Sequence, residues 1–127
     1  MKIANALFSL TLITLLAVVA SGAEAKAPSV IPQPQSIKTL AGESFALTAD
    51  TAIVYAGDKA KGPAEMLAAM LRPATGFALA VKPGAKAGKN AILLTSDGAD
   101  AKLGSEGYKL TVGSGGAVIK SSGAAGL

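Results

Sequence analysis

Residues 106–127 read EGYKLTVGSGGAVIKSSGAAGL, and this stretch decides the fold. Tyr108, Leu110 and Val112 alternate with a lysine and a threonine, and this period of two predicts a strand with one apolar face. The glycine-rich residues 113–116 are typical of a tight turn. The stretch therefore predicts a β-hairpin with Tyr108, Leu110 and Val112 on one side of the sheet.

The last residues of the stretch predict the start of a helix. Residues 117–120 form the partner strand, and residues 121–127 follow with Ser122 as a candidate N-cap. We expect this helix to cover one face of the sheet. Because it is not continued, we expect the chain to be truncated before that cover.

One helix is expected upstream, from Pro63 to Arg72. Proline is well tolerated at the first helical position, where its missing N–H has no partner. Helical spacing places Leu67, Met70 and Leu71 on a packing face with Ala74, and Glu65, Ala69 and Arg72 on the other. Two methionines on a helix can also serve as an adaptable binding surface, but beside leucines we expect them in the core.

The remaining strands are expected at residues 36–39, 44–48, 51–55, 78–82 and 91–95. The first two would form a hairpin around a turn at residues 40–43, where Gly42 can adopt a positive φ. Six or seven strands and one helix predict an α+β domain, in which the helix packs on one face of a small antiparallel or mixed sheet.

The N-terminus predicts a cleaved signal peptide over residues 1–25. Met1 and Lys2 are followed by an apolar run, and Ala23 and Ala25 form the A-x-A pattern of a cleavage site. An alternative cleavage follows Ser21-Gly22-Ala23, and a membrane anchor is the rival interpretation. Small residues at the exit and the lack of a following basic cluster favour cleavage. We therefore expect export without a stable membrane anchor, to the periplasm or the medium.

Residues 26–127 are long enough for one small domain. The chain has no cysteine, which excludes both disulfides and a lipidated cysteine. Of 12 basic and 8 acidic residues, the expected cleavage removes one of each, so the net charge remains +4. No run of five basic residues occurs and export separates the chain from cytoplasmic nucleic acid, so we expect no nucleic-acid partner.

Few residues are suited to catalysis. The chain has no histidine, so it lacks the usual base and the commonest metal ligand, and we expect neither a metal nor a cofactor. Asp97 and Asp100 lack the ligand spacing of a calcium loop and indicate a turn. The glycines at 113–116 lead into a strand rather than a helix, which argues against a phosphate site. The other acidic residues fall in expected turns or on the exposed helix face: Glu43, Asp50, Asp58, Glu65 and Glu106.

Three segments resemble a known family. Residues 30–36 (VIPQPQS) resemble the opening of bacterial family 20 glycoside hydrolases, the β-N-acetylhexosaminidases. Residues 103–112 (LGSEGYKLTV) are similar to the "EGY-x-L-x-V" strand of the small domain before the catalytic barrel. Residues 117–127 (AVIKSSGAAGL) match the following strand and the "GL" that begins a covering helix.

The resemblance implies a fold and a parent activity. Family members remove terminal N-acetyl-β-hexosamine residues from glycans such as chitin oligomers or peptidoglycan fragments. The substrate's own acetamide is the nucleophile, with an Asp-Glu pair in the (β/α)8 barrel. No position here matches that pair, so no catalytic residue is carried over. We expect an inactive N-terminal domain whose partner is the catalytic barrel of a longer polypeptide.

Two alternatives stay open. The chain is either a stand-alone envelope domain that binds glycans or other partners, or the accessory domain of another glycosidase family, such as the family 84 N-acetylglucosaminidases or the α-glucuronidases. A stand-alone glycan binder would be poorly equipped, because few aromatic residues are present to stack on sugars. For residues 26–127 alone we expect poor solubility, because the uncovered sheet would expose apolar side chains.

Overall fold

The computed structural model describes residues 29–40 and 42–127. The chain divides into two units, residues 1–39 and residues 40–127. Within the first unit, residues 29–39 contain no helix or strand, and only Pro34 is partly buried. The expected signal peptide, including Ala23 and Ala25, lies outside the described residues.

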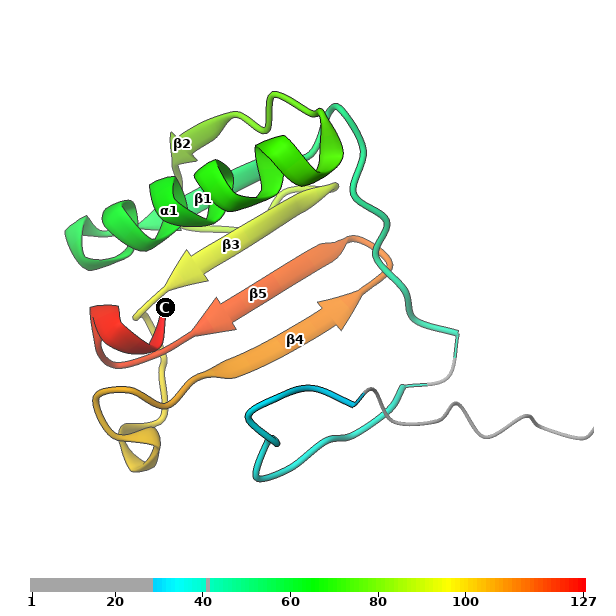
Figure 1. Cartoon of the computed structure of the whole chain (residues 1–127). Helices are drawn as coiled ribbons and strands as arrows, with labels where there is room; N and C mark the ends of the chain where they lie inside the picture. Colours follow the sequence, from blue (N-terminus) through cyan, green and yellow to red (C-terminus); the bar gives the residue numbers. More distant parts are fainter. Residues whose placement is uncertain (1–28, 41) are drawn as a thin grey trace, which may run out of the picture. The chain divides into compact units, whose positions relative to one another are not determined.

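The second unit is built on a five-stranded sheet in the order β2-β1-β3-β5-β4 (Figure 1). Its strands are β1 (Ala52–Ala56), β2 (Val81–Pro83), β3 (Ala91–Thr95), β4 (Lys109–Gly113) and β5 (Gly116–Lys120). The strands β2, β1, β3 and β5 run parallel to their neighbours, and β4 pairs antiparallel with β5. The predicted α+β class with a mixed sheet is confirmed.

Strand β3 lies in the middle of the sheet and is buried along all five of its residues. A strand covered on both faces has no solvent side, so its sequence, AILLT, is an apolar run rather than an alternation. Its expected bounds, 91–95, are confirmed. The β4–β5 hairpin is also confirmed, with Gly113 and Gly116 as the last paired residues before a two-residue turn.

A single long helix, α1 (Asp58–Thr75), packs on one face of the sheet. The expected start near Pro63 is wrong, because α1 begins five residues earlier and includes both Pro63 and Pro73. Buried Ala60 anchors the first turn against the sheet, and this packing outweighs the backbone hydrogen bond that Pro63 removes. Gly76 ends the helix in the left-handed conformation, donating its N–H to the Arg72 carbonyl at 2.8 Å.

The helix approaches the sheet through alanines. Ala60, Ala64 and Ala68 are fully buried, and they form the main core cluster with Ile53 and Leu94 of the sheet. Because an alanine side chain is a single methyl group, the helix backbone lies close to the sheet and the larger sheet residues fill the space between. Alternate strand residues on the opposite face form a second, smaller cluster, of Val54, Ala91 and Leu93.

The expected hairpin over residues 36–48 is wrong. Its turn is present, because Glu43 N–H approaches the Leu40 carbonyl at 3.5 Å and Gly42 has a φ of 75°. Residues 36–40 and 42–48 nevertheless form no strand. Side chains hold residues 43–48 to the sheet instead, since the Glu43 carboxylate accepts a hydrogen bond from the Ser114 N–H at 2.6 Å and Thr48 Oγ1 accepts one from Asn90.

Short 3-10 turns complete the unit: η1 (Ala101–Leu103) and η2 (Ala124–Gly126). The expected N-cap at Ser122 is wrong, because Gly123 precedes η2 and the Ser122 hydroxyl donates to the Gly104 carbonyl instead. Among the helices of the described residues, none has the length and apolar character needed to cross a membrane.

Candidate functional site

The face of the sheet on which α1 lies is only partly covered. Helix α1 contacts β1, β2 and β3, whereas β4 lies at the far edge of the sheet (Figure 1). In the β4–β5 register, Leu110 is opposite Ile119 and Val112 is opposite Ala117. Since Ala117 and Ile119 contribute to the core beneath α1, Leu110 and Val112 lie on that same face.

Three apolar side chains of this region are exposed. Tyr108 is 58 %, Leu110 52 % and Val112 38 % exposed. We call Tyr108, Leu110 and Val112 the β4 patch. Leu110 and Val112 share one face of β4, and Tyr108 directly precedes the strand. Exposed apolar groups gathered in this way mark interaction sites.

The chain end forms one border of this face. The Ser121 hydroxyl donates to the Gly107 carbonyl at 2.7 Å and so ties the residues after β5 to the loop before β4. Gly126 of η2 is buried against this loop with no room for a β-carbon. Leu127 packs on the main core cluster and is partly buried. This packing agrees with the prediction that the terminal residues begin to cover the sheet. The covering structure that they form is the single turn η2.

Helix α1 presents a second apolar surface. Met66 and Met70 are 63 % and 69 % exposed, so the expectation that they belong to the core is wrong. The buried stripe is made of the three alanines, with Leu67 and Leu71 partly buried beside it. The methionines belong to the outer side of α1, which agrees with the alternative interpretation of an adaptable contact surface.

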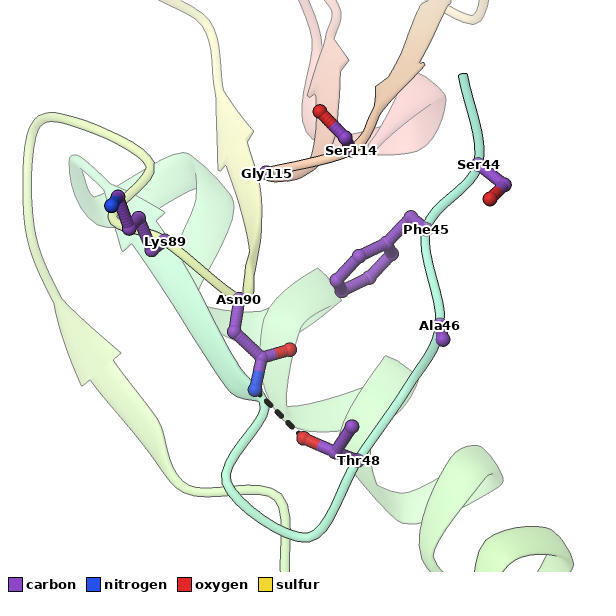
Figure 2. Close-up of a pocket in the computed structure, with 8 residues that line it drawn as sticks. All are labelled: Ser44, Phe45, Ala46, Thr48, Lys89, Asn90, Ser114 and Gly115. Atoms are coloured by element: carbon purple, nitrogen blue, oxygen red, sulfur yellow. Dashed lines mark hydrogen bonds between the residues drawn. The ribbon is translucent and has the colours of Figure 1, made fainter. Parts of the chain in front are cut away.

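A hollow of ≈ 570 Å³ opens beside the start of β3 (Figure 2). The Phe45 ring points into it, and Lys89 and Ser114 are among its other lining residues. Its best-organised residue is Asn90, whose Nδ2 donates to Thr48 Oγ1 and whose Oδ1 accepts from Thr51 Oγ1, each at 2.7 Å. The hollow is therefore lined by a hydrogen-bond network that holds the segment before β1 to the start of β3.

The backbone of Asn90 reinforces this role. Its N–H donates to the Gly115 carbonyl at 2.7 Å, and its carbonyl accepts from the Ala52 N–H at 3.2 Å. Its φ is 56°, a conformation that asparagine tolerates better than most residues. Both ends of the side-chain amide and both backbone groups thus have partners, which indicates a structural role for Asn90. Sequence reasoning missed this network, and the signal was an asparagine directly before an apolar strand.

The acidic residues are dispersed. All seven acidic residues of the described chain are exposed: Glu43, Asp50, Asp58, Glu65, Asp97, Asp100 and Glu106. Asp97 and Asp100 form a turn, as predicted, in which the Asp100 carboxylate accepts from the Lys102 N–H at 2.9 Å. No group of three or more acidic residues that would suit a metal ion occurs among the described residues.

Comparison with known families decides the identity. The family model of glycosyl hydrolase family 20, domain 2, matches residues 27–127. The chain belongs to this family. A solved structure agrees: the family 20 β-N-acetylhexosaminidase of Streptomyces coelicolor A3(2) shares 34 % identity, with a TM-score of 0.68 over 80 % of this chain. Comparison with curated proteins gives no match.

The Streptomyces enzyme is much longer than this family 20 domain 2. The matched region is only 20 % of the Streptomyces enzyme, so the chain spans about a fifth of that protein's length. The family match also decides between the glycosidase families considered from the sequence, in favour of family 20. The chain is thus an accessory domain of the hexosaminidase family.

Proposed function

We propose that this family 20 domain 2 is a structural support that docks against the catalytic domain of a β-N-acetylhexosaminidase. The observation that carries the proposal is the β4 patch, an exposed apolar surface on the face that α1 leaves uncovered. An exposed patch of this kind favours burial against a partner, because each removal of apolar area from water stabilises the contact.

The outer side of α1 supports the same proposal. Met66 and Met70 add apolar area that no described residue covers. The occupant that we assign to these surfaces is the remainder of a hexosaminidase. The Streptomyces enzyme supports this assignment, because the region that resembles this chain is a minor part of it.

We further propose that the parent enzyme is exported and removes terminal, non-reducing N-acetyl-β-hexosamine residues from glycans such as chitin oligomers or peptidoglycan fragments. Family membership supports this activity. The described residues supply no reacting group of their own, because their carboxylates are exposed and dispersed, whereas glycoside hydrolysis uses acids that face the scissile bond. The isolated chain is therefore inactive.

A hydrolysis assay tests the proposed division of roles. The purified 127-residue chain is incubated with a chromogenic N-acetyl-β-glucosaminide, beside an active family 20 enzyme as a positive control. We expect no release of the chromophore above the rate in buffer. Turnover that co-purifies with the chain through two chromatographic steps would show that the domain is itself an enzyme, and the support role would be wrong.

A further inference from the structure

The face of the sheet opposite α1 has a different character from the docking side. Val118 and Val54 lie on this face, as shown by the second core cluster. Lys120 is two residues beyond Val118, and Lys109 is its direct partner on β4, so both belong to the same face. Lys82 belongs to it as well, because it pairs with Val54. We call this surface the basic face.

Two more lysines extend the basic face. The segment after β2 crosses it, since a β-carbon on Gly84 would touch the side chain of Val54. This segment carries Lys86 and Lys89, and Lys89 lines a shallow hollow with Val118. Lys82, Lys86, Lys89 and Lys109 are exposed and Lys120 is partly buried.

The strand positions of the basic face carry no acid, and the nearest carboxylates lie in turns at its rim. Glu43 reaches the β4–β5 turn, and Asp97 adjoins Gly98, on which a β-carbon would lie 3.5 Å from Lys120 Nζ. Lys82 and Lys120 are on strands three places apart, which at the usual spacing corresponds to about 14 Å across the sheet. A ligand that contacts both is therefore an extended one.

The pairing of Lys109 with Lys120 is unfavourable in the absence of a ligand. Like charges directly opposite on neighbouring strands destabilise a sheet, and here they are Cα partners on one face. An anion placed between two such lysines relieves their repulsion. This arrangement is a second indication, independent of the number of lysines, that the face receives negative charge.

The composition of the face discriminates among polyanions. Its apolar residues Val54 and Leu93 are buried and Val118 is partly buried, so its strands offer little apolar surface for insertion into a membrane. Of the aromatic residues that the structure describes, Tyr55, Phe45 and Phe77 pack on the core beneath α1, and Tyr108 is in the β4 patch. The basic face therefore lacks the aromatic platforms on which neutral sugars and unpaired bases stack.

We propose that the basic face binds an acidic polysaccharide, recognised by its carboxylates rather than by ring stacking. The inference rests on the proposed function, because an enzyme that acts on glycans encounters charged glycan chains more often than other polyanions. Bound on the side opposite the docking surfaces, such a chain would hold the hexosaminidase at a glycan matrix without obstructing the contact with the catalytic domain.

The test compares three probes and two variants of the 127-residue chain. The probes are polygalacturonate, neutral N-acetylglucosamine oligomers and duplex DNA. Binding is measured by isothermal titration calorimetry at about 50 and about 200 mM salt, because contacts between charges weaken over this range. One variant combines Lys109→Gln and Lys120→Gln. Its matched control combines Lys59→Gln and Lys61→Gln on α1, an equal loss of charge on the other side of the sheet.

We expect polygalacturonate to bind with an affinity that falls as salt rises, and the neutral oligomers not to bind. Loss of two ion pairs, one at exposed Lys109 and one at partly buried Lys120, should raise the Kd of the basic-face variant by about five- to tenfold and leave the control within about twofold of the wild type. Equal binding of the two variants, tighter binding of DNA than of polygalacturonate, or binding of the neutral oligomers would overturn the proposal. The urea midpoint of each variant shows whether it is folded. A failure of the binding prediction would leave the expected result of the hydrolysis assay and the proposed support role unchanged.

Discussion

The substitution Leu110→Asp tests whether Leu110 belongs to an interaction surface or to the core of the isolated chain. Leu110 is 52 % exposed, so about half of its side chain is already in water. Complete burial of a leucine stabilises a protein by about 1.5–3 kcal/mol, and the buried half therefore contributes about 1 kcal/mol. We expect Leu110→Asp to lower the free energy of unfolding of the chain by about this amount, and to reduce self-association because it interrupts the β4 patch.

Thr111→Asp is the matched control. Thr111 is the next residue of the same strand, it is exposed, and it belongs to the basic face. Both substitutions introduce the same charge and the same low β-propensity, so a difference between them reports the face and not the strand. Binding of the dye ANS and sedimentation velocity measure the apolar surface and the self-association.

We expect Leu110→Asp to lower dye binding and shift the chain towards the monomer, while Thr111→Asp leaves both unchanged. A loss of about 3 kcal/mol or more on Leu110→Asp would show that the residue is already covered in the isolated chain. Equal effects of the two substitutions on dye binding would also refute the assignment of the β4 patch to an interface.

Two further substitutions test the core and the hydrogen-bond network. Ala64 is fully buried, so Ala64→Leu forces a larger side chain between α1 and the sheet and should lower the free energy of unfolding in urea by about 1–3 kcal/mol. Ala69→Leu, on the exposed side of the helix, should change it by less than about 0.5 kcal/mol. Similar effects at both positions would mean that the buried stripe is misassigned. Asn90→Ala removes the amide that links Thr48 and Thr51 and places alanine at a φ of 56°, so it should lower the free energy of unfolding by about 1–3 kcal/mol. Asn90→Gly should lower it less, because glycine tolerates that φ. A thermal melt in which the glycine variant is the less stable of the two would contradict this explanation.

The strands that the sequence predicts well are those with an unambiguous pattern. Strand β3 is a continuous apolar run because it is buried on both faces, and the β4–β5 hairpin combines alternation with a glycine turn. The hairpin expected over residues 36–48 failed because its turn chemistry is real but its neighbours are held by the side chains of Glu43 and Thr48 instead of by strand pairing. The local propensities of residues 36–48 cannot predict these contacts, because the partners lie far away in the sequence.

The helix shows why the sequence predicted only some of the exposed apolar residues on this side of the sheet. Met70 follows the leucine pattern, so periodicity assigns it to the core, yet the stripe that contacts the sheet is made of alanines. Alanine gives a weak hydrophobic signal, although its small size permits the closest approach of a helix to a sheet. The exposed position of Leu110 and its neighbours was expected in outline, from a sheet face without a cover, and the extent of α1 determines which strand is left open.

Cysteine protection in the proposed parent hexosaminidase tests the central claim most directly. The chain has no cysteine, so Leu110→Cys and Thr111→Cys each introduce a single reactive thiol into this domain. We predict that a maleimide labels both variants rapidly in the isolated chain, and that within the hexosaminidase the thiol at position 110 becomes protected while the thiol at position 111 stays reactive. Equal labelling of position 110 in both contexts would contradict the assignment of the β4 patch as the surface that supports the catalytic domain.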